Sequence, residues 1–221
     1  MPTISKEDYL KTIFNQRIEK NGMVTTSRLA EVLEISNAAT SEMAKKLSDE
    51  GFVQYQKYKG LDLTGEGEKI ALEVIRRHRL WELFLMKVLN LSWSEVHDEA
   101  EMLEHTTTDF LINKIDEYLK YPQFDPHGSP IPGKNGEMPL QPFIMPLNQT
   151  ESGKSYFVKR VADENSELVN YFSKIGLLID SEIFIKQKFS FDNSIIINVR
   201  NVDITLSEKV CKSIFVIPNN P

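Results

Sequence analysis

Residues 25–64 read TTSRLAEVLEISNAATSEMAKKLSDEGFVQYQKYKGLDLT, and this stretch decides the fold of the first third of the chain. Apolar residues recur at helical spacing in two runs, 25–36 and 37–51. Residues 52–56 and 61–64 are rich in β-forming side chains and flank the segment KYKG, so they predict a hairpin. The predicted order is therefore helix, short turn, helix and two-stranded ribbon.

This order of elements is that of a winged helix-turn-helix, in which the second helix offers polar side chains to base edges in the major groove. Lysines at the ribbon tip suit phosphate contacts. The alternative is a small helical bundle without a DNA role, because residues 1–63 carry 9 basic and 9 acidic side chains and no net positive charge. The predicted DNA contacts are Arg28, Ser36, Asn37, Ala38, Thr40, Ser41, Glu42, Lys45, Lys57 and Lys59.

The overall composition is that of an ordinary globular protein, with 41% hydrophobic and 26% charged residues. No run of 18 apolar residues predicts a membrane span, and the first residues do not resemble a signal peptide. The single cysteine, Cys211, excludes an internal disulfide framework and a multi-cysteine zinc site. We therefore expect a cytoplasmic protein that has no membrane partner.

The acidic excess of the chain is concentrated in its middle third. Residues 64–140 contain 8 basic and 14 acidic side chains, and the whole chain has a net charge of −6. All four histidines also lie in this third: His78, His97, His105 and His127. An account of function has to explain this concentration.

Several of these histidines and carboxylates share one helix face. His97, Glu101, Glu104 and His105 are spaced i, i+4, i+7 and i+8, and a second pair four residues apart precedes them in HRLWE. Imidazole and carboxylate ligands on facing helices suit Mn²⁺, Fe²⁺, Co²⁺ or Zn²⁺, and oxygen-rich sets favour Mn²⁺. The alternative is a solvated acidic helix with scattered histidines.

The motifs that accompany catalysis are absent from the sequence. The chain contains no Gly-x-Ser-x-Gly elbow, no P-loop, no Gly-x-Gly-x-x-Gly and no His-Glu-x-x-His. The Glu-x-x-His pairs of di-metal bundle enzymes are also missing, because Glu101 and His105 are four residues apart. We therefore expect a metal-binding protein that is not an enzyme, with a di-metal enzyme as the less favoured alternative.

The remaining segments predict the rest of the architecture. Residues 66–90 predict one helix, and 92–119 predict a second amphipathic helix with Ser92 or Ser94 as its N-cap. Residues 121–147 hold seven of the ten prolines and predict a loop and linker. The last 70 residues predict a small β domain, a partly open barrel with one helical segment.

The chain resembles the DtxR/MntR family of metal-dependent transcriptional regulators. The resemblance rests on the winged helix, on HRLWE at 78–82, VHDEAEMLEH at 96–105 and SPIPG at 129–133, and on the small β domain. It implies a mainly α fold with small β parts. The implied parts are a winged-helix DNA-binding domain (1–72), a helical dimerisation and metal-binding domain (73–140), a Pro-rich linker (141–152) and an SH3-like, FeoA-like domain (153–221).

The resemblance also implies the roles of individual residues. The primary metal site would use Asp8, Glu101, Glu104 and His105, and the ancillary site His78, Glu82 and His97. The third domain of such regulators adds ligands to the ancillary site, and Glu164 and Glu167 are the candidates here. The apolar stretch Leu80–Leu89 would form the dimer contact.

Two departures from the family pattern bear on the metal. Where iron-responsive members carry Met and Cys, this chain has Asp8 and Glu101, and hard oxygen ligands favour Mn²⁺ over Fe²⁺. Manganese members without a third domain use Glu where this chain has Lys11, so we expect two separated sites. Co²⁺, Zn²⁺ and Cd²⁺ are expected as surrogates.

The resemblance implies a homodimer that binds a palindromic double-stranded operator. Metal would bridge the DNA-binding and dimerisation domains and activate repression of metal-uptake genes. The alternative is a metal buffer or chaperone that has no DNA role.

Overall fold

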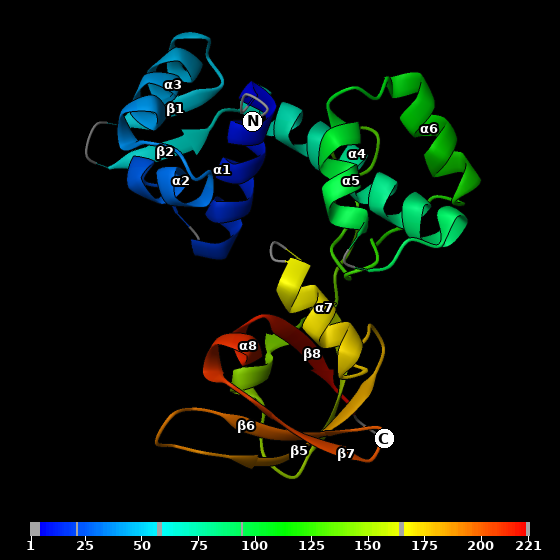
Figure 1. Cartoon of the computed structure of the whole chain (residues 1–221). Coiled ribbons are helices and arrows are strands. Elements are labelled where there is room, and N and C mark those ends of the chain that lie inside the picture. Colours follow the sequence, from blue (N-terminus) through cyan, green and yellow to red (C-terminus); the bar gives the residue numbers. More distant parts are fainter. Residues whose placement is uncertain (1–4, 21, 57–58, 94, 164–165, 220–221) are drawn as a thin grey trace. The chain divides into compact units, whose positions relative to one another are not determined.

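The computed structural model describes residues 5–20, 22–56, 59–93, 95–163 and 166–219. The chain divides into two compact units: unit 1 comprises residues 1–77 and 132–137, and unit 2 comprises residues 78–131 and 138–221. One long helix, α4 (Gly65–Leu89), contributes its first half to unit 1 and its second half to unit 2 (Figure 1). The predicted helix 66–90 is thus confirmed.

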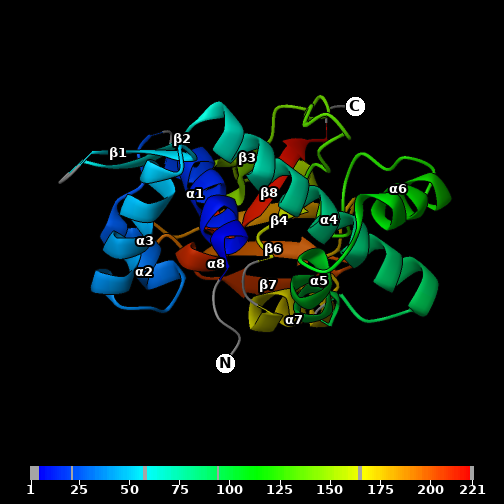
Figure 2. The ribbon, with the colours of Figure 1, turned by 90° about the horizontal axis from the view of Figure 1, so that it is seen from above.

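Unit 1 is a three-helix domain with a two-stranded ribbon. Its elements are α1 (Lys6–Lys20), α2 (Thr26–Val32), α3 (Asn37–Asp49), β1 (Val53–Gln56) and β2 (Gly60–Leu63). The ribbon is antiparallel and lies beside α3 (Figure 2). This is the winged helix-turn-helix that the sequence predicts.

Local chemistry fixes where these helices begin. The Thr25 and Ser36 side chains cap α2 and α3 by accepting hydrogen bonds from backbone N–H groups three residues on. At the start of α1, Asp8 Oδ2 accepts a hydrogen bond from the Ser5 N–H (2.7 Å) and Ser5 Oγ accepts one from the Asp8 N–H (3.2 Å). This reciprocal pair is a capping box.

Two further helices belong to unit 2, α5 (Val96–Glu104) and α6 (Asp109–Tyr118). The prediction of one continuous helix over 92–119 is wrong, because Thr108 caps a new helix by accepting the Leu111 N–H. The prediction of a serine N-cap is also wrong for Ser92, since the cap of α5 is Glu95 and no side-chain hydrogen bond accompanies it. Ser94 lies outside the described residues.

The apolar stretch at the end of α4 is mostly buried within its own unit. Leu80 and Leu83 pack with Ile112 and Ile115 of α6 and with Ile131. Leu80 and Leu83 are therefore not free for a dimer contact, whereas Trp81 and Phe84 are partly exposed and Leu89 is exposed, so the dimer contact around Leu80–Leu89 stays a prediction. The large apolar side chains that unit 2 exposes near this core are Leu89, Met102, Phe110, Leu111, Tyr118 and Tyr121.

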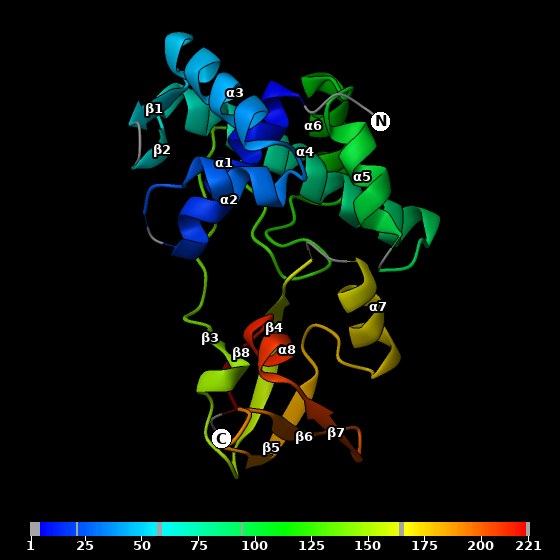
Figure 3. The same cartoon turned by 60° about the vertical axis from the view of Figure 1, so that its left-hand side comes forward.

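The rest of unit 2 is a six-stranded antiparallel sheet in the order β3-β8-β4-β5-β6-β7 (Figure 3). The strands are β3 (Met145–Pro146), β4 (Ser155–Val161), β5 (Glu182–Lys188), β6 (Ile195–Val199), β7 (Val202–Leu206) and β8 (Ile214–Pro218). Two helices accompany them, α7 (Ser166–Lys174) and α8 (Glu208–Lys212), together with a 3₁₀ turn, η1 (Leu147–Gln149). The predicted small β domain with one helical segment is confirmed, and β3, α8 and β8 add to it.

The core of this β domain extends to residues outside it. Alternate side chains of β4, β5, β6 and β8 surround the fully buried Phe172 of α7. Leu147 is fully buried in the same core, so part of the predicted linker 141–152 is a structural element of the β domain. Trp93, which precedes α5, also packs here. In the described part of the chain, no helix is long and apolar enough to cross a membrane.

Candidate metal centre

Helices α4 and α5 present histidines and carboxylates to each other within unit 2. His78 and Glu82 lie one turn apart on α4, and Glu101 and Glu104 lie on α5. Glu82 and Glu104 are fully buried, although ionisable side chains are rarely buried without partners. The two helices are fixed by a relay in which Trp81 Nε1 donates to Thr107 Oγ1 (2.7 Å), which donates to the Leu103 carbonyl (2.6 Å).

The first cluster, centre A, consists of His78, Glu101, Glu104 and His105. Glu104 lies between two imidazoles, with His78 Nδ1 2.6 Å from its Oε2 and His105 Nε2 3.3 Å from its Oε1. His78 Nδ1 is also 3.8 Å from Glu101 Oε1. Ligand atoms of Glu101, Glu104 and His105 all lie within 4.8 Å of one another, which is close enough for one cation. Three of the four predicted primary ligands are thus together, and His78 joins them.

Asp8, the fourth predicted primary ligand, lies on α1 in unit 1. One of its carboxylate oxygens already caps the helix, as described above. Its participation in centre A stays a prediction.

The predicted ancillary ligands also come together. Glu82 Oε1 lies 3.1 Å from His78 Nε2 and 3.3 Å from His97 Nδ1, and the two imidazole rings are 5.0 Å apart. Of the candidates from the third domain, Glu167 is exposed on α7, and Glu164 lies outside the described residues. Among the described residues, no ligand group includes Glu167.

A second cluster, centre B, consists of Glu82, Asp125, His127 and Asp163, whose ligand atoms all lie within 4.8 Å of one another. His127 Nδ1 is 3.7 Å from Glu82 Oε2 and 3.7 Å from Asp163 Oδ2, too far for hydrogen bonds. Three of these residues are buried, and Asp163 is partly exposed.

The buried polar atoms of centre B fit a divalent cation. Within the described residues, Glu82 Oε2, Asp125 Oδ2 and His127 Nδ1 are buried side-chain atoms without a hydrogen-bond partner, and of the three only Asp125 Oδ2 faces a cationic Arg side chain, with Arg79 Nε 3.6 Å away. Burying an unsatisfied polar atom costs about 1–3 kcal/mol, and more for a charged one. Three such atoms on residues of one cluster fit a divalent cation, which satisfies carboxylate oxygens and an imidazole nitrogen together.

The loop that carries His127 fixes the orientation of the imidazole ring. Asp125 Oδ1 accepts hydrogen bonds from the N–H groups of His127 (2.8 Å) and Ser129 (2.9 Å), which closes a tight turn. The Trp93 ring stacks on the imidazole at 5.1 Å, and His127 Nε2 lies 3.2 Å from the Trp93 carbonyl oxygen. Because Nε2–H donates to this carbonyl, Nδ1 is the nitrogen left for a ligand.

A glycine allows the loop to pass close to the β domain. Gly128 has φ +85°, and a Cβ there would lie 2.0 Å from the Lys159 carbonyl oxygen of β4. The Val161 N–H donates to the His127 carbonyl at 3.0 Å. The end of β4 is thereby held against the loop, and Asp163 follows two residues later.

The charges of centre B shift one another's pKa values. Burial by itself raises the pKa of Asp125, and the neighbouring carboxylates of Glu82 and Asp163 raise it further, to about 7. Burial by itself would lower the pKa of His127, but the surrounding carboxylates outweigh it and raise the pKa to about 9. Burial opposes ionisation of Glu82 too, but His78 and the other nearby histidines lower its pKa well below the usual range. Without metal, the cluster therefore holds protons where it would hold a cation.

Asp125, His127 and Asp163 were not among the predicted ligands. They come from a loop and a strand end, far apart in sequence, so no helical spacing connects them. The available signal was His127 itself, the one histidine of the acidic third to which the sequence analysis gave no role.

The predicted DNA-contact residues lie on and around α3. Ser36, Asn37, Ala38, Glu42 and Lys45 are exposed, as is Lys59 in the ribbon, whereas Ser41 is half-buried and Lys57 lies outside the described residues. The prediction that Thr40 contacts DNA is wrong. Its side chain is fully buried, and its Oγ1 donates a hydrogen bond to the Ser36 carbonyl at 3.1 Å. Thr40 therefore supports the start of the helix and cannot reach a base. Arg28 is half-buried and pairs with Gln16 (2.7 Å) and Glu31 (3.0 Å).

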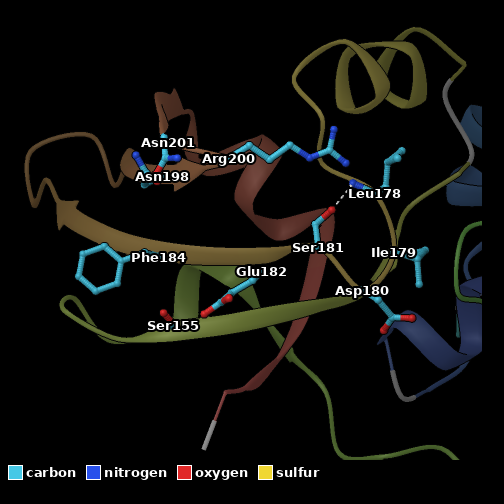
Figure 4. A pocket seen from close by; sticks show the side chains of 10 residues that line it. All are labelled: Ser155, Leu178, Ile179, Asp180, Ser181, Glu182, Phe184, Asn198, Arg200 and Asn201. Atoms are coloured by element: carbon cyan, nitrogen blue, oxygen red, sulfur yellow. Dashed lines mark hydrogen bonds between the residues drawn. The ribbon is translucent and has the colours of Figure 1, made fainter. Parts of the chain in front are cut away.

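A pocket of about 570 Å³ opens on the β domain (Figure 4). Its two carboxylates have other partners, since Asp180 pairs with Lys159 and Glu182 accepts a hydrogen bond from Asn219. The Ser181 hydroxyl accepts a hydrogen bond from the Leu178 N–H. None of these residues belongs to a ligand cluster among the described residues, where the ligand groups are centre B, the residues of centre A and the adjoining group His78, His97 and Glu101.

Three family descriptions match consecutive parts of the chain. Residues 1–61 match the N-terminal DNA-binding domain of the iron-dependent repressors, and residues 64–133 match their metal-binding and dimerisation domain. Residues 145–218 match the FeoA domain. The β domain thus has the predicted FeoA-like, SH3-like identity.

Individual relatives agree with this assignment. The HTH-type transcriptional regulator MntR of Oceanobacillus iheyensis is 34% identical over 121 residues, which are 55% of this chain and 81% of the relative. The iron-dependent repressor IdeR of Mycobacterium leprae is 35% identical over 128 residues, which are 58% of this chain and 55% of the relative.

A solved structure is similar over nearly the whole length. It is described as a manganese-dependent transcriptional repressor in complex with manganese, with a TM-score of 0.89 and 35% identity over 96% of this chain and 99% of that one. The chain therefore belongs to the iron-dependent repressor family, whose members are metal-dependent, DNA-binding transcriptional repressors and not enzymes.

Proposed function

We propose that this repressor is activated by Mn²⁺ bound at centres A and B, and that it controls metal-uptake genes from the cytoplasm. The observation that carries the proposal is the set of three buried ligand atoms in centre B that make no hydrogen bond among the described residues, in a cluster whose three carboxylates face Arg79 and His127 as cationic groups. Glu101, Glu104, His105 and His78 would hold the cation of centre A, and Asp8 would complete that set. The cations would supply positive charge to the buried carboxylates beyond that of Arg79 and the histidines.

The preference for Mn²⁺ follows from the donor atoms. Centre B offers three carboxylates and one imidazole, and centre A offers the carboxylates of Glu101 and Glu104 and the imidazole of His105, with the His78 imidazole beside Glu104. Neither centre contains sulfur, and hard oxygen ligands favour Mn²⁺ over the softer or more thiophilic ions. Fe²⁺ is the nearest competitor because imidazole also suits it.

Activation would link the two units of the chain. Asp8 belongs to unit 1, whereas Glu101, Glu104 and His105 belong to unit 2. A cation shared by these residues would restrict the movement of the DNA-binding domain relative to the dimerisation domain. In a homodimer this restriction sets the separation of the two α3 helices, which has to match the half-sites of a palindromic operator.

The second copy would bind at the exposed apolar side chains around α6. Phe110, Tyr118 and Tyr121 are 75%, 65% and 68% exposed, and Leu111 and Leu89 are also exposed. A monomer seldom presents so many large apolar side chains together on and near one helix. The part of the chain that matches the dimerisation domain includes all of them.

Selection of duplexes from a random pool, with and without Mn²⁺, tests the proposal because it needs no prior operator. We expect palindromic duplexes to be enriched only with Mn²⁺, and their affinity, followed by fluorescence anisotropy, to fall at least tenfold in Glu104→Gln. Glu99→Gln, on the exposed face of the same helix, is the matched control. A duplex affinity that is the same with and without Mn²⁺ would contradict the proposal. Mn²⁺ binding without any duplex enrichment would indicate a metal buffer.

A further inference from the structure

Glu82 contacts residues of both metal centres. It is fully buried on α4, and its two carboxylate oxygens point to different groups. Oε1 lies 3.1 Å from His78 Nε2, and His78 Nδ1 lies 2.6 Å from Glu104 of centre A. Oε2 has no hydrogen-bond partner and faces His127 of centre B at 3.7 Å.

The two oxygens therefore have two different functions. Through Oε2, Glu82 is a ligand of centre B. Through Oε1, it accepts the Nε2–H of His78 and leaves Nδ1 of that ring directed at centre A. A carboxylate that holds a ligating histidine in this way fixes the tautomer and the ring orientation and increases the basicity of the other nitrogen.

We propose that Glu82 couples the two centres, so that a divalent cation bound at centre B tightens the binding of a second cation at centre A. This inference rests on the proposed function, because it assumes that both clusters bind metal. When Oε2 is bound at centre B, the carboxylate cannot rotate, and Oε1 stays in place for His78. Without a cation at centre B, the buried Oε2 makes no hydrogen bond within the described residues and has the His127 imidazole 3.7 Å away, which holds it less firmly than a ligated cation would.

Charge does not oppose this coupling. Centre B carries three carboxylates and Arg79 lies 3.6 Å from one of them, so a divalent cation bound beside a neutral His127 leaves the cluster without net charge. A filled centre B therefore does not repel a second cation at centre A. The coupling is also reciprocal, since a cation at centre A must tighten centre B by the same factor, typically 5- to 150-fold (about 1–3 kcal/mol).

Anaerobic titration of the full chain with Mn²⁺ measures this coupling, because free aqueous Mn²⁺ is counted by its electron paramagnetic resonance signal. We expect two bound ions in the unmodified chain. Asp163→Asn, a partly exposed ligand of centre B only, should lose one ion and weaken the remaining one at least fivefold. Glu104→Gln should lose the other ion and weaken centre B by the same factor, which the fluorescence of Trp93, stacked on His127, reports.

Glu82→Asp tests the positioning role of the carboxylate itself. The shorter side chain keeps the charge but cannot reach both centres, so Asp163→Asn in this background should change the affinity of centre A less than twofold. Glu99→Gln controls for the loss of a negative charge, and circular dichroism checks that each variant is folded.

The inference is overturned if the ion left in Asp163→Asn binds as tightly as in the unmodified chain, or if the coupling persists in Glu82→Asp. Failure of the proposed function gives a different result, because the unmodified chain would then bind no Mn²⁺ at micromolar concentration.

Discussion

At His127 and Asp125, burial among carboxylates changes the protonation state that the folded chain prefers. The pKa of His127 rises from 6.5 to about 9 and that of Asp125 from 3.8 to about 7, so both groups hold protons more tightly when folded. A raised pKa stabilises the folded state below the unfolded pKa, and this stability is lost as the pH rises through the folded pKa.

We therefore expect the metal-free chain to lose stability between pH 6.5 and 9. The contribution of His127 over this window is of order 3 kcal/mol, and Asp125 adds to the loss up to about pH 7. Thermal unfolding with a chelator present measures it, and His127→Gln should flatten the profile above pH 7. Saturating Mn²⁺ should do the same, since the cation replaces the protons. A metal-free chain that becomes more stable towards pH 9 would contradict the assignment.

Gly128 is a second single-residue test, because its positive φ and the nearby Lys159 carbonyl leave no room for a side chain. Gly128→Ala should destabilise the fold by about 1–3 kcal/mol and displace His127, so the variant should also bind one Mn²⁺ fewer. Gly153→Ala is the matched control, since Gly153 has φ +79° but open space around its Cα. The control should lose stability without losing the ion, as judged by denaturant unfolding and Mn²⁺ titration.

At the scale of elements, the orientation of α5 depends on one buried polar relay. Thr107 accepts the indole N–H of Trp81 and donates to the Leu103 carbonyl, at the point where α5 ends. Thr107→Val keeps the shape but leaves the indole N–H unsatisfied, so it should cost about 1–3 kcal/mol of unfolding free energy and weaken Mn²⁺ binding at centre A. Thr106→Val, at an exposed position on the same turn, removes a longer hydrogen bond to the Leu103 carbonyl (3.3 Å) and leaves the indole N–H satisfied, so it should change both much less. Equal effects of the two variants in urea unfolding would show that the relay does not position α5.

Sequence periodicity predicts some elements of the fold and not others. The helix α4, the ribbon and four strands of the β domain follow from local patterns, and the i, i+4 spacing correctly groups His78 with Glu82. The break between α5 and α6 does not follow from apolar periodicity, since it depends on the capping hydroxyl of Thr108. Centre B does not follow either, because the folded β domain alone brings the loop with His127 to α4 and to the strand end that precedes Asp163.

For the whole molecule, the proposed function requires both a second copy and a metal, and the two requirements can be separated by mutation. Phe110 and Tyr118 are exposed on α6, away from the ligand side chains of both centres. Replacing both with Glu should shift the chain from dimer to monomer in sedimentation velocity, because charged side chains oppose burial at an interface. The monomer should still bind two Mn²⁺ ions but lose at least 100-fold in affinity for a selected palindromic duplex.

Lys114→Glu on the same helix is the charge control, since Lys114 is exposed and pairs with Glu117. A variant that stays dimeric would place the interface elsewhere, and a monomer with undiminished duplex affinity would contradict recognition of paired half-sites.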